Sequence, residues 1–193
     1  VTKEDAGTTR TVVVKDQNDA AESIPVTRIN VTHMDNTVTK IDKVIFTAAQ
    51  AQLLTAKAGP GSNTSTILID EVPGDEADEI AVEIPAEAVR LLAGHNYALH
   101  VQTVFGTIRL QGNVLSSLNH NNTDLYFRLV PVKQAEEQEK IVHAVPAGYT
   151  AVGTPLEVET NYRGFETTLF IPFERNGVDS NRVQPESLAV YIE

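Results

Sequence analysis

The chain has 193 residues, of which 41% are hydrophobic, and its 26 acidic against 15 basic side chains give a formal net charge of -11. Such a charge repels a phosphate backbone or an anionic bilayer, which argues against nucleic acid or a membrane surface as a partner. Cysteine is absent, so disulfides and thiolate chemistry are excluded, and no run approaches the roughly 18 apolar residues of a membrane span.

Val, Ile and Thr dominate the alternating segments, which predicts a mainly β fold. Residues 1–9 are polar and are expected to be a mobile tail, and Thr9–Lys15 follows as a strand near a free end. Polar residues 16–25 and 59–66 predict a connection and a loop. Further strands are predicted at residues 26–32, 37–46, 67–70, 98–103, 107–110 and 125–132.

The middle of the chain contains a repeat. Val44–Leu54 matches Val82–Leu92 in its Val, Ala and Leu-Leu positions, and Ile108–Leu118 is a weaker third copy. Each copy predicts a strand that leads into a short helix. Thr47 with Gln50 has the spacing of a capping box, and Pro85 suits the first turn of a helix.

The most polar run, Lys133–Lys140, predicts a domain boundary. Beyond it, alternation over residues 156–162 and 169–173, with turn signals at Arg163-Gly164 and Asn176-Gly177, predicts about four strands. An immunoglobulin-like sandwich needs about seven. The predicted fold is therefore mainly β (α+β). It consists of an N-terminal tail (1–15), a β-rich repeat domain with short helices (16–132) and an incomplete immunoglobulin-like β-sandwich (141–193).

Four segments resemble the β-rich modules of Gram-positive bacterial surface proteins that carry S-layer homology domains. They are Pro85–Leu92, Phe105–Leu110, Gly153–Tyr162 and Phe170–Phe173, and the resemblance covers roughly residues 67–193. It implies an extracellular, cell-surface location. In that family further strands follow the equivalent of Leu188–Ile192. The chain also begins at Val1 without a signal peptide, so we expect a processed mature chain or a piece of a longer one.

A search for chemistry gives few candidates. The five histidines lack zinc-ligand spacing, and no nucleophile elbow, phosphate loop or dinucleotide fingerprint is present. The acidic loop Asp70–Glu79 is a possible calcium site, but it lacks the alternating ladder of a calcium loop, so a solvated loop is preferred. Isolated carboxylates at Glu157, Glu159 and Glu166 read as solvent-facing strand positions. We therefore expect no enzyme and no cofactor.

Two other patterns concern the surface. Asn30, Asn63 and Asn121 each begin a glycosylation triplet, which arises often by chance in a Thr-rich chain. The five tyrosines could form a sugar-stacking platform, but their scattered spacing favours core or edge positions.

The leading hypothesis is a non-enzymatic extracellular structural protein, a surface-layer or fibre subunit that forms homo-oligomers or filaments through β-domain contacts. In its sharper form, one subunit donates a strand to the open final domain of the next. The donor residues would be Thr11, Val12, Val13, Val14 and Lys15. Alternatively, this strand pairs within its own chain. A rival from another class is an adhesin or carbohydrate-binding module that binds polysaccharide.

Overall fold

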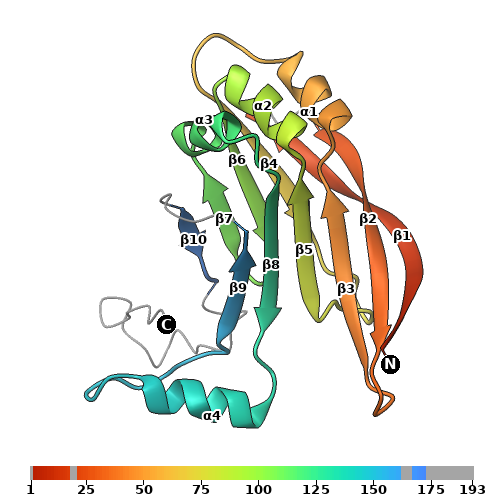
Figure 1. Cartoon of the computed structure of the whole chain (residues 1–193), viewed down its shortest axis with the longest axis vertical. Helices are drawn as coiled ribbons and strands as arrows, with labels where there is room; N and C mark the ends of the chain where they lie inside the picture. The colour runs from red at the N-terminus through yellow and green to blue at the C-terminus, as the bar shows by residue number, and fades with distance from the viewer. Residues whose placement is uncertain (1, 18–20, 162–166, 173–193) are drawn as a thin grey trace.

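The two longest strands form a hairpin at the centre of a curled, ten-stranded mixed sheet (Figure 1). The computed structural model describes residues 2–17, 21–161 and 167–172. The strands are β1 (Lys3–Asp16), β2 (Ala21–Thr32), β3 (Val38–Ile45), β4 (Asn63–Ile69), β5 (Glu79–Ile84), β6 (Tyr97–Thr103), β7 (Thr107–Leu110), β8 (Leu125–Pro131), β9 (Leu156–Thr160) and β10 (Thr168–Phe170). The helices are α1 (Ala48–Thr55), α2 (Ala86–Gly94), α3 (Gly112–His120) and α4 (Ala135–Ala144).

The strand order is β10-β7-β6-β4-β1-β2-β3-β5-β8-β9, and its two halves repeat the same orientations. β4 is antiparallel to β1, as β3 is to β2. The next strand outward is parallel in both halves, β6 on β4 and β5 on β3. β7 with β10 on one side, and β8 with β9 on the other, complete the sheet in antiparallel pairing.

The predicted repeat is confirmed as three strand-to-helix units. β3 leads into α1, β5 into α2 and β7 into α3, and after each helix the chain enters the opposite half of the sheet. The predicted capping box is also present, because Thr47 and Gln50 bond each other's backbone at the start of α1. Pro85 is the N-cap of α2, one residue earlier than the first turn in which we predicted it.

Alternation of apolar residues places the core on the inner face of the curl. Val12, Val14, Ile24 and Val26 of the central hairpin are buried there, and Phe127 lies on the same face of β8. Helices α1 to α3 lie together at one end of the sheet (Figure 1) and add buried side chains to the same cluster. These are Ala51, Leu54, Ala88, Val89, Leu92, Val114, Leu115 and Leu118.

The mainly β prediction is confirmed, but an immunoglobulin-like sandwich is not. β9 pairs with β8 and β10 with β7, so both described strands of the region 141–193 join the sheet built by residues 3–131. Residues 135–144, at the predicted boundary, form α4. The expected tail is a strand from Lys3 onward, because the hairpin register continues to Thr32. Tyr162, Arg163-Gly164 and the turn at Asn176-Gly177 lie outside the described residues.

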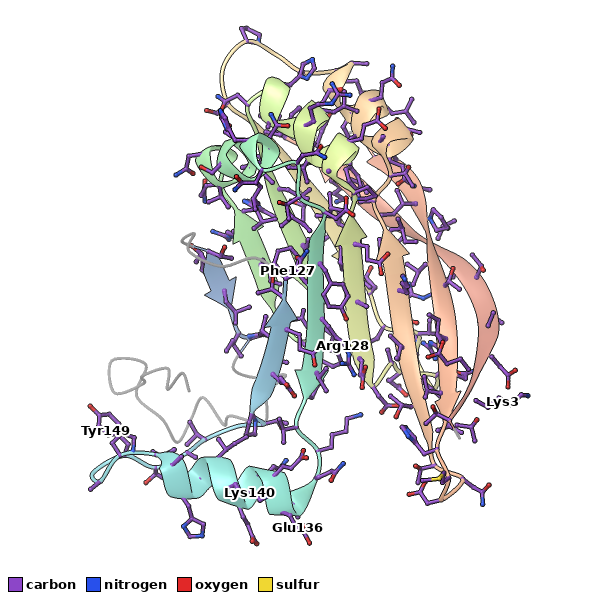
Figure 2. All side chains as sticks on the ribbon, viewed as in Figure 1. Lys3, Phe127, Arg128, Glu136, Lys140 and Tyr149 are labelled. Carbon is purple, nitrogen blue, oxygen red and sulfur yellow. The ribbon has the colours of Figure 1, made fainter. Side chains whose placement is uncertain are left out.

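Helix α4 belongs to the segment that connects β8 to β9, residues 132–155, which we call the α4 arm. It contains no buried residue. Figure 2 shows Glu136, Lys140 and Tyr149 on this arm, away from the strands. Since an isolated helix of this length is marginal in water, α4 itself contributes little to the stability of the sheet.

Candidate functional site

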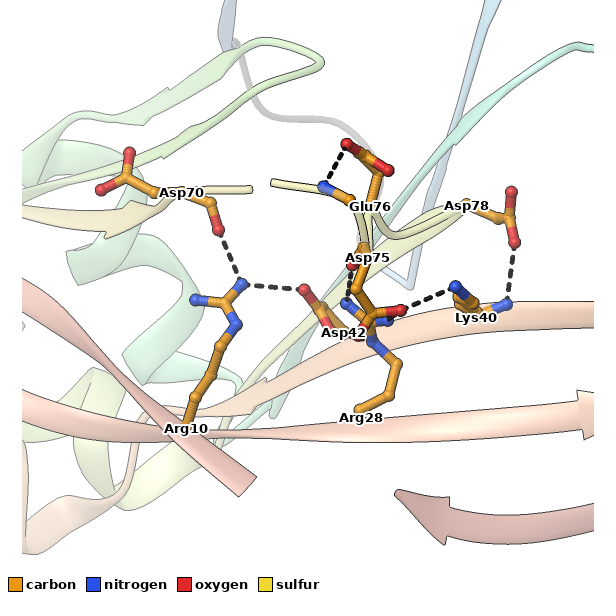
Figure 3. Close-up of polar contacts among 9 residues, drawn as sticks. Arg10, Arg28, Lys40, Asp42, Asp70, Asp75, Glu76 and Asp78 are labelled. Carbon is orange, nitrogen blue, oxygen red and sulfur yellow. Dashed lines mark hydrogen bonds and ion pairs between the residues drawn. The ribbon is translucent and has the colours of Figure 1, made fainter. Parts of the chain in front are cut away.

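A charged cluster interrupts the apolar inner face at the end of the sheet opposite α1 to α3. Asp42 of β3 is 3% exposed and accepts from two arginines of the central hairpin (Figure 3). Arg28 Nε lies 2.6 Å from Asp42 Oδ1, and Arg10 Nη2 lies 2.8 Å from Asp42 Oδ2. Strand alternation brings these three side chains to one face, because Arg28 and Asp42 are direct partners in the β2–β3 register.

The connection between β4 and β5, residues 70–78, covers this cluster. Arg10 Nη2 donates to the carbonyl oxygen of Asp70 at 2.7 Å. Arg28 Nη2 donates to the carbonyl oxygen of Asp75 at 2.9 Å. Arg28 Nη1 lies 3.1 Å from Asp75 Oδ1, an ion pair without hydrogen-bond geometry. The connection is thus held on the sheet by the buried guanidinium group of Arg28 and the partly exposed one of Arg10.

Two lysines contact carboxylates of this connection. Lys40 Nζ lies 2.6 Å from Asp75 Oδ1, and Lys133 Nζ lies 2.6 Å from Asp78 Oδ1. The hydrogen bond from Lys40, together with Arg28, lowers the pKa of Asp75. Burial alone would raise the pKa of Asp78, but the hydrogen bond and charge of Lys133 and the backbone N–H of Lys40 lower it. These carboxylates are therefore ionised partners of fixed cations.

This geometry bears on the possible calcium site. Within the acidic loop Asp70–Glu79, Asp75 and Asp78 each contact a basic side chain from outside the loop. Glu79 pairs with Arg128 on the outer face of the sheet. Glu76 instead accepts from the backbone N–H of Gly74. In the part of the chain that the structure describes, no group of three or more His, Asp or Glu side chains is arranged to hold a metal ion.

A cavity of about 370 Å³ lies beside the same connection. Glu71 and Glu76 contribute carboxylates to its wall, and Phe105, from the β6–β7 turn, contributes an aromatic ring. The other lining residues are Ala77, Val104, Pro131, Lys133, Thr154, Leu156 and Pro172. Its wall therefore combines carboxylate acceptors with apolar surface, which suits an uncharged polar ligand or a cation.

The predicted donor strand lies in the middle of the sheet. Val13 is paired with Ser23 of β2 on one side and with Leu68 of β4 on the other. Val12 and Val14 are buried in the core. Residues 11–15 thus have partners in their own chain, which is the alternative that the sequence left open.

The outer face of the sheet carries two features that sequence reasoning missed. Arg128 of β8 contacts Glu79 of β5 at 2.7 Å and Glu159 of β9 at 3.0 Å. Arg109 of β7 stacks on the ring of Phe170 in β10, with 3.9 Å from its guanidinium carbon to the ring centre. No sequence motif predicts either contact, since each joins strands that are distant in sequence.

The histidines do not converge. His95 ends α2 and contacts the carbonyl oxygen of Leu91, whereas His100 lies on β6, where burial foremost and Arg109 secondly lower its pKa. His33 lies in the β2–β3 turn, His120 is the last residue of α3, and His143 lies on α4. Of the isolated carboxylates, Glu159 pairs with Arg128, Glu157 is exposed on β9, and Glu166 lies outside the described residues.

Other surface candidates are equally scattered. Asn63 is buried and bonded to the carbonyl oxygens of Gly59, Gly61 and His95, Asn30 lies within β2, and Asn121 is exposed after α3. Tyr97 is buried and donates to Leu54, Tyr126 lies on β8, and Tyr149 is exposed on the α4 arm. Tyr162 and Tyr191 lie outside the described residues, and the three described tyrosines form no row.

Comparisons with known proteins add no relative. No protein-family model, curated protein or solved structure matches the chain. Among the described residues, no helix is both long and apolar enough to cross a membrane.

Proposed function

We propose that the chain is a non-enzymatic structural subunit of an extracellular surface layer or fibre, and that it assembles through the outer strands of its sheet. The supporting observation is the exposure of apolar side chains on β9 and β10. Val158 and Leu169 are each 37% exposed, and Phe170 is 45% exposed. Apolar side chains on outer strands favour contact with another protein surface. The surface location rests on the resemblance of residues 67–193 to bacterial surface modules.

Assembly through β9 and β10 differs from donation of residues 11–15. Donation would break the pairing of β1 with both β2 and β4, and would remove Val12 and Val14 from the core. Contacts through the outer strands leave this core intact. The incomplete sandwich predicted for residues 141–193 stays a prediction, because much of that region lies outside the described residues.

The assembly is tested by light scattering over a concentration series and by electron microscopy of the same samples. We expect wild-type oligomers or filaments, and their loss on Phe170→Ser with Val158→Ser. Met34→Ser is the matched control, since Met34 is 84% exposed at the β2–β3 turn, far from both strands in the sheet order. Assembly that survives the double substitution would count against a role for the outer strands.

A disulfide separates the two modes of assembly. Val13 and Leu68 are direct register partners, and the chain has no cysteine, so Val13→Cys with Leu68→Cys can lock β1 to β4. Oligomers that form equally well in the oxidised and reduced protein would exclude donation by residues 11–15. Oligomers that form only after reduction would favour it.

The cavity beside residues 70–78 favours a second candidate, a polysaccharide-binding module. Carboxylates accept hydrogen bonds from sugar hydroxyls, and Phe105 offers an aromatic surface. A glycan array with the wild type, Glu71→Gln and Phe105→Ala tests it. Binding that either substitution weakens supports this function, and an array without signal above background removes it.

A further inference from the structure

Arg109 differs from the other arginines of the described chain. Arg10, Arg28, Arg90 and Arg128 each contact at least one carboxylate. For Arg109, the described residues supply only the ring of Phe170 and no carboxylate. Its Nε is buried without a hydrogen-bond partner. Among the described residues Arg109 is thus a cation without a carboxylate partner, although the chain has a net charge of -11.

The neighbours of Arg109 place its side chain on the outer face of the sheet, beside an exposed aromatic ring. Arg109 lies on the outer face, since Ile108 and Leu110 on either side of it are buried on the inner face. Phe170 lies beside it with 45% of its surface exposed. A guanidinium group held on an aromatic ring still offers its Nη donors to a carboxylate. Arginine next to an exposed aromatic residue is the composition typical of interface hot spots.

The opposite edge of the described sheet, strand β9, carries a carboxylate that could pair with Arg109. Glu157 of β9 is exposed, and no cation of the described residues contacts it, whereas its neighbour Glu159 is held by Arg128. Glu157 and Glu159 are two positions apart, so both face the outer side, as Arg109 does. One edge of the described sheet thus carries an unpaired cation, Arg109, next to β10. The other edge carries an unpaired carboxylate, Glu157, on β9.

We propose that the Arg109–Phe170 pair is the docking site for Glu157 of a second copy of this chain. The inference rests on the proposed function and names the contact through which that assembly occurs. The two patches differ, so the contact is heterologous, and repeating it gives a ring or an open filament. Leu169 and Val158, both partly exposed on the inner face, would adjoin each other across the same contact.

Charge reversal tests this contact. We expect Arg109→Glu and Glu157→Arg each to raise the concentration for half-maximal assembly at least about tenfold. Arg90→Glu is the matched control, because Arg90 is an exposed arginine on α2, away from both outer strands. Far-UV circular dichroism checks that each variant is folded, and Glu157→Arg changes only an exposed side chain.

An equimolar mixture of the two variants gives the sharpest result. Every contact between unlike copies then pairs opposite charges, so assembly should return to the wild-type concentration range. No rescue in the mixture, or a loss for Arg109→Glu no larger than for Arg90→Glu, would overturn the docking site while wild-type assembly still stands. A wild-type protein that stays monomeric would overturn the proposed function and the docking site together.

Discussion

Asp42 is a buried carboxylate that forms ion pairs with two arginines of the central hairpin. It accepts from Arg10 and Arg28, and the hydrogen bond to Asp42 raises the pKa of Arg28. Removing one partner of a buried ion pair leaves the other charge without compensation. The two arginines would then remain on the inner face with fewer acceptors.

We expect Asp42→Ala to lower the free energy of unfolding by about 3 kcal/mol. Urea denaturation followed by circular dichroism measures the change. Asp35→Ala, at an exposed turn position, should lower the free energy of unfolding far less than Asp42→Ala does. Equal effects of the two substitutions would show that the buried cluster is not a major source of stability.

His100 makes stability depend on pH. Burial foremost and the charge of Arg109 lower its pKa below the ordinary 6.5. As the pH falls below about 6.5, the unfolded chain binds a proton that the folded chain does not bind until lower pH, so stability falls over this window. The lowered pKa values of Asp75 and Asp78 act below about 3.8, outside it.

We therefore expect the melting temperature of the wild type to fall between pH 7.5 and pH 5.5 by more than that of His100→Gln. Thermal unfolding at the two pH values measures the difference. His143→Gln, on the exposed α4 arm, should retain the wild-type dependence. A pH dependence that is unchanged in His100→Gln would contradict this assignment.

At this scale the sequence identifies local pairs and misses distant ones. The capping box was predictable because Thr47 and Gln50 lie within one helical turn. Arg28 and Asp42 meet only through the β2–β3 register, and Arg109 and Phe170 only because β10 returns to β7. Such contacts depend on strand pairing that local propensity does not determine.

Among the elements, β10 lies close to the β6–β7 turn, and Gly106 of this turn allows the close approach. A Cβ atom at Gly106 would lie 2.8 Å from the carbonyl oxygen of Phe170, closer than a side chain tolerates against backbone. At Gly94, at the end of α2, an added Cβ meets nothing within 4 Å. The two glycines therefore form a matched pair for testing how β10 is attached.

We expect Gly106→Ala to displace β10 and to speed amide hydrogen exchange in the paired residues Thr107–Arg109 at least about tenfold. Gly94→Ala should leave this exchange unchanged. Unaltered exchange in Gly106→Ala would mean that β10 is not seated against this turn.

The repeat was the most predictable part of the fold, because each copy of its strand-to-helix pattern is contained in 11 consecutive residues. The partners of β9 and β10 were not predictable, since alternation identifies a strand but not its neighbour. The α4 helix was missed as well. Its Glu-rich sequence has no buried residue and so resembles a solvated connection.

For the whole molecule, the shared sheet implies a shared transition. β9 and β10 pair with β8 and β7, so they should unfold together with the central strands. We expect one cooperative urea transition in which far-UV circular dichroism coincides with the fluorescence of tyrosine, including the buried Tyr97. Two separated transitions would instead indicate a distinct domain over residues 141–193.

The order of the strands also has a kinetic meaning. β1 and β2 come first in the chain and occupy the centre, and each later strand is added beside one that precedes it in sequence. At every length the strands already made form an unbroken sheet, and the next strand finds its neighbour in place. A chain that emerges from its N-terminus, during synthesis or export, can therefore fold outward from the middle without waiting for its C-terminal end.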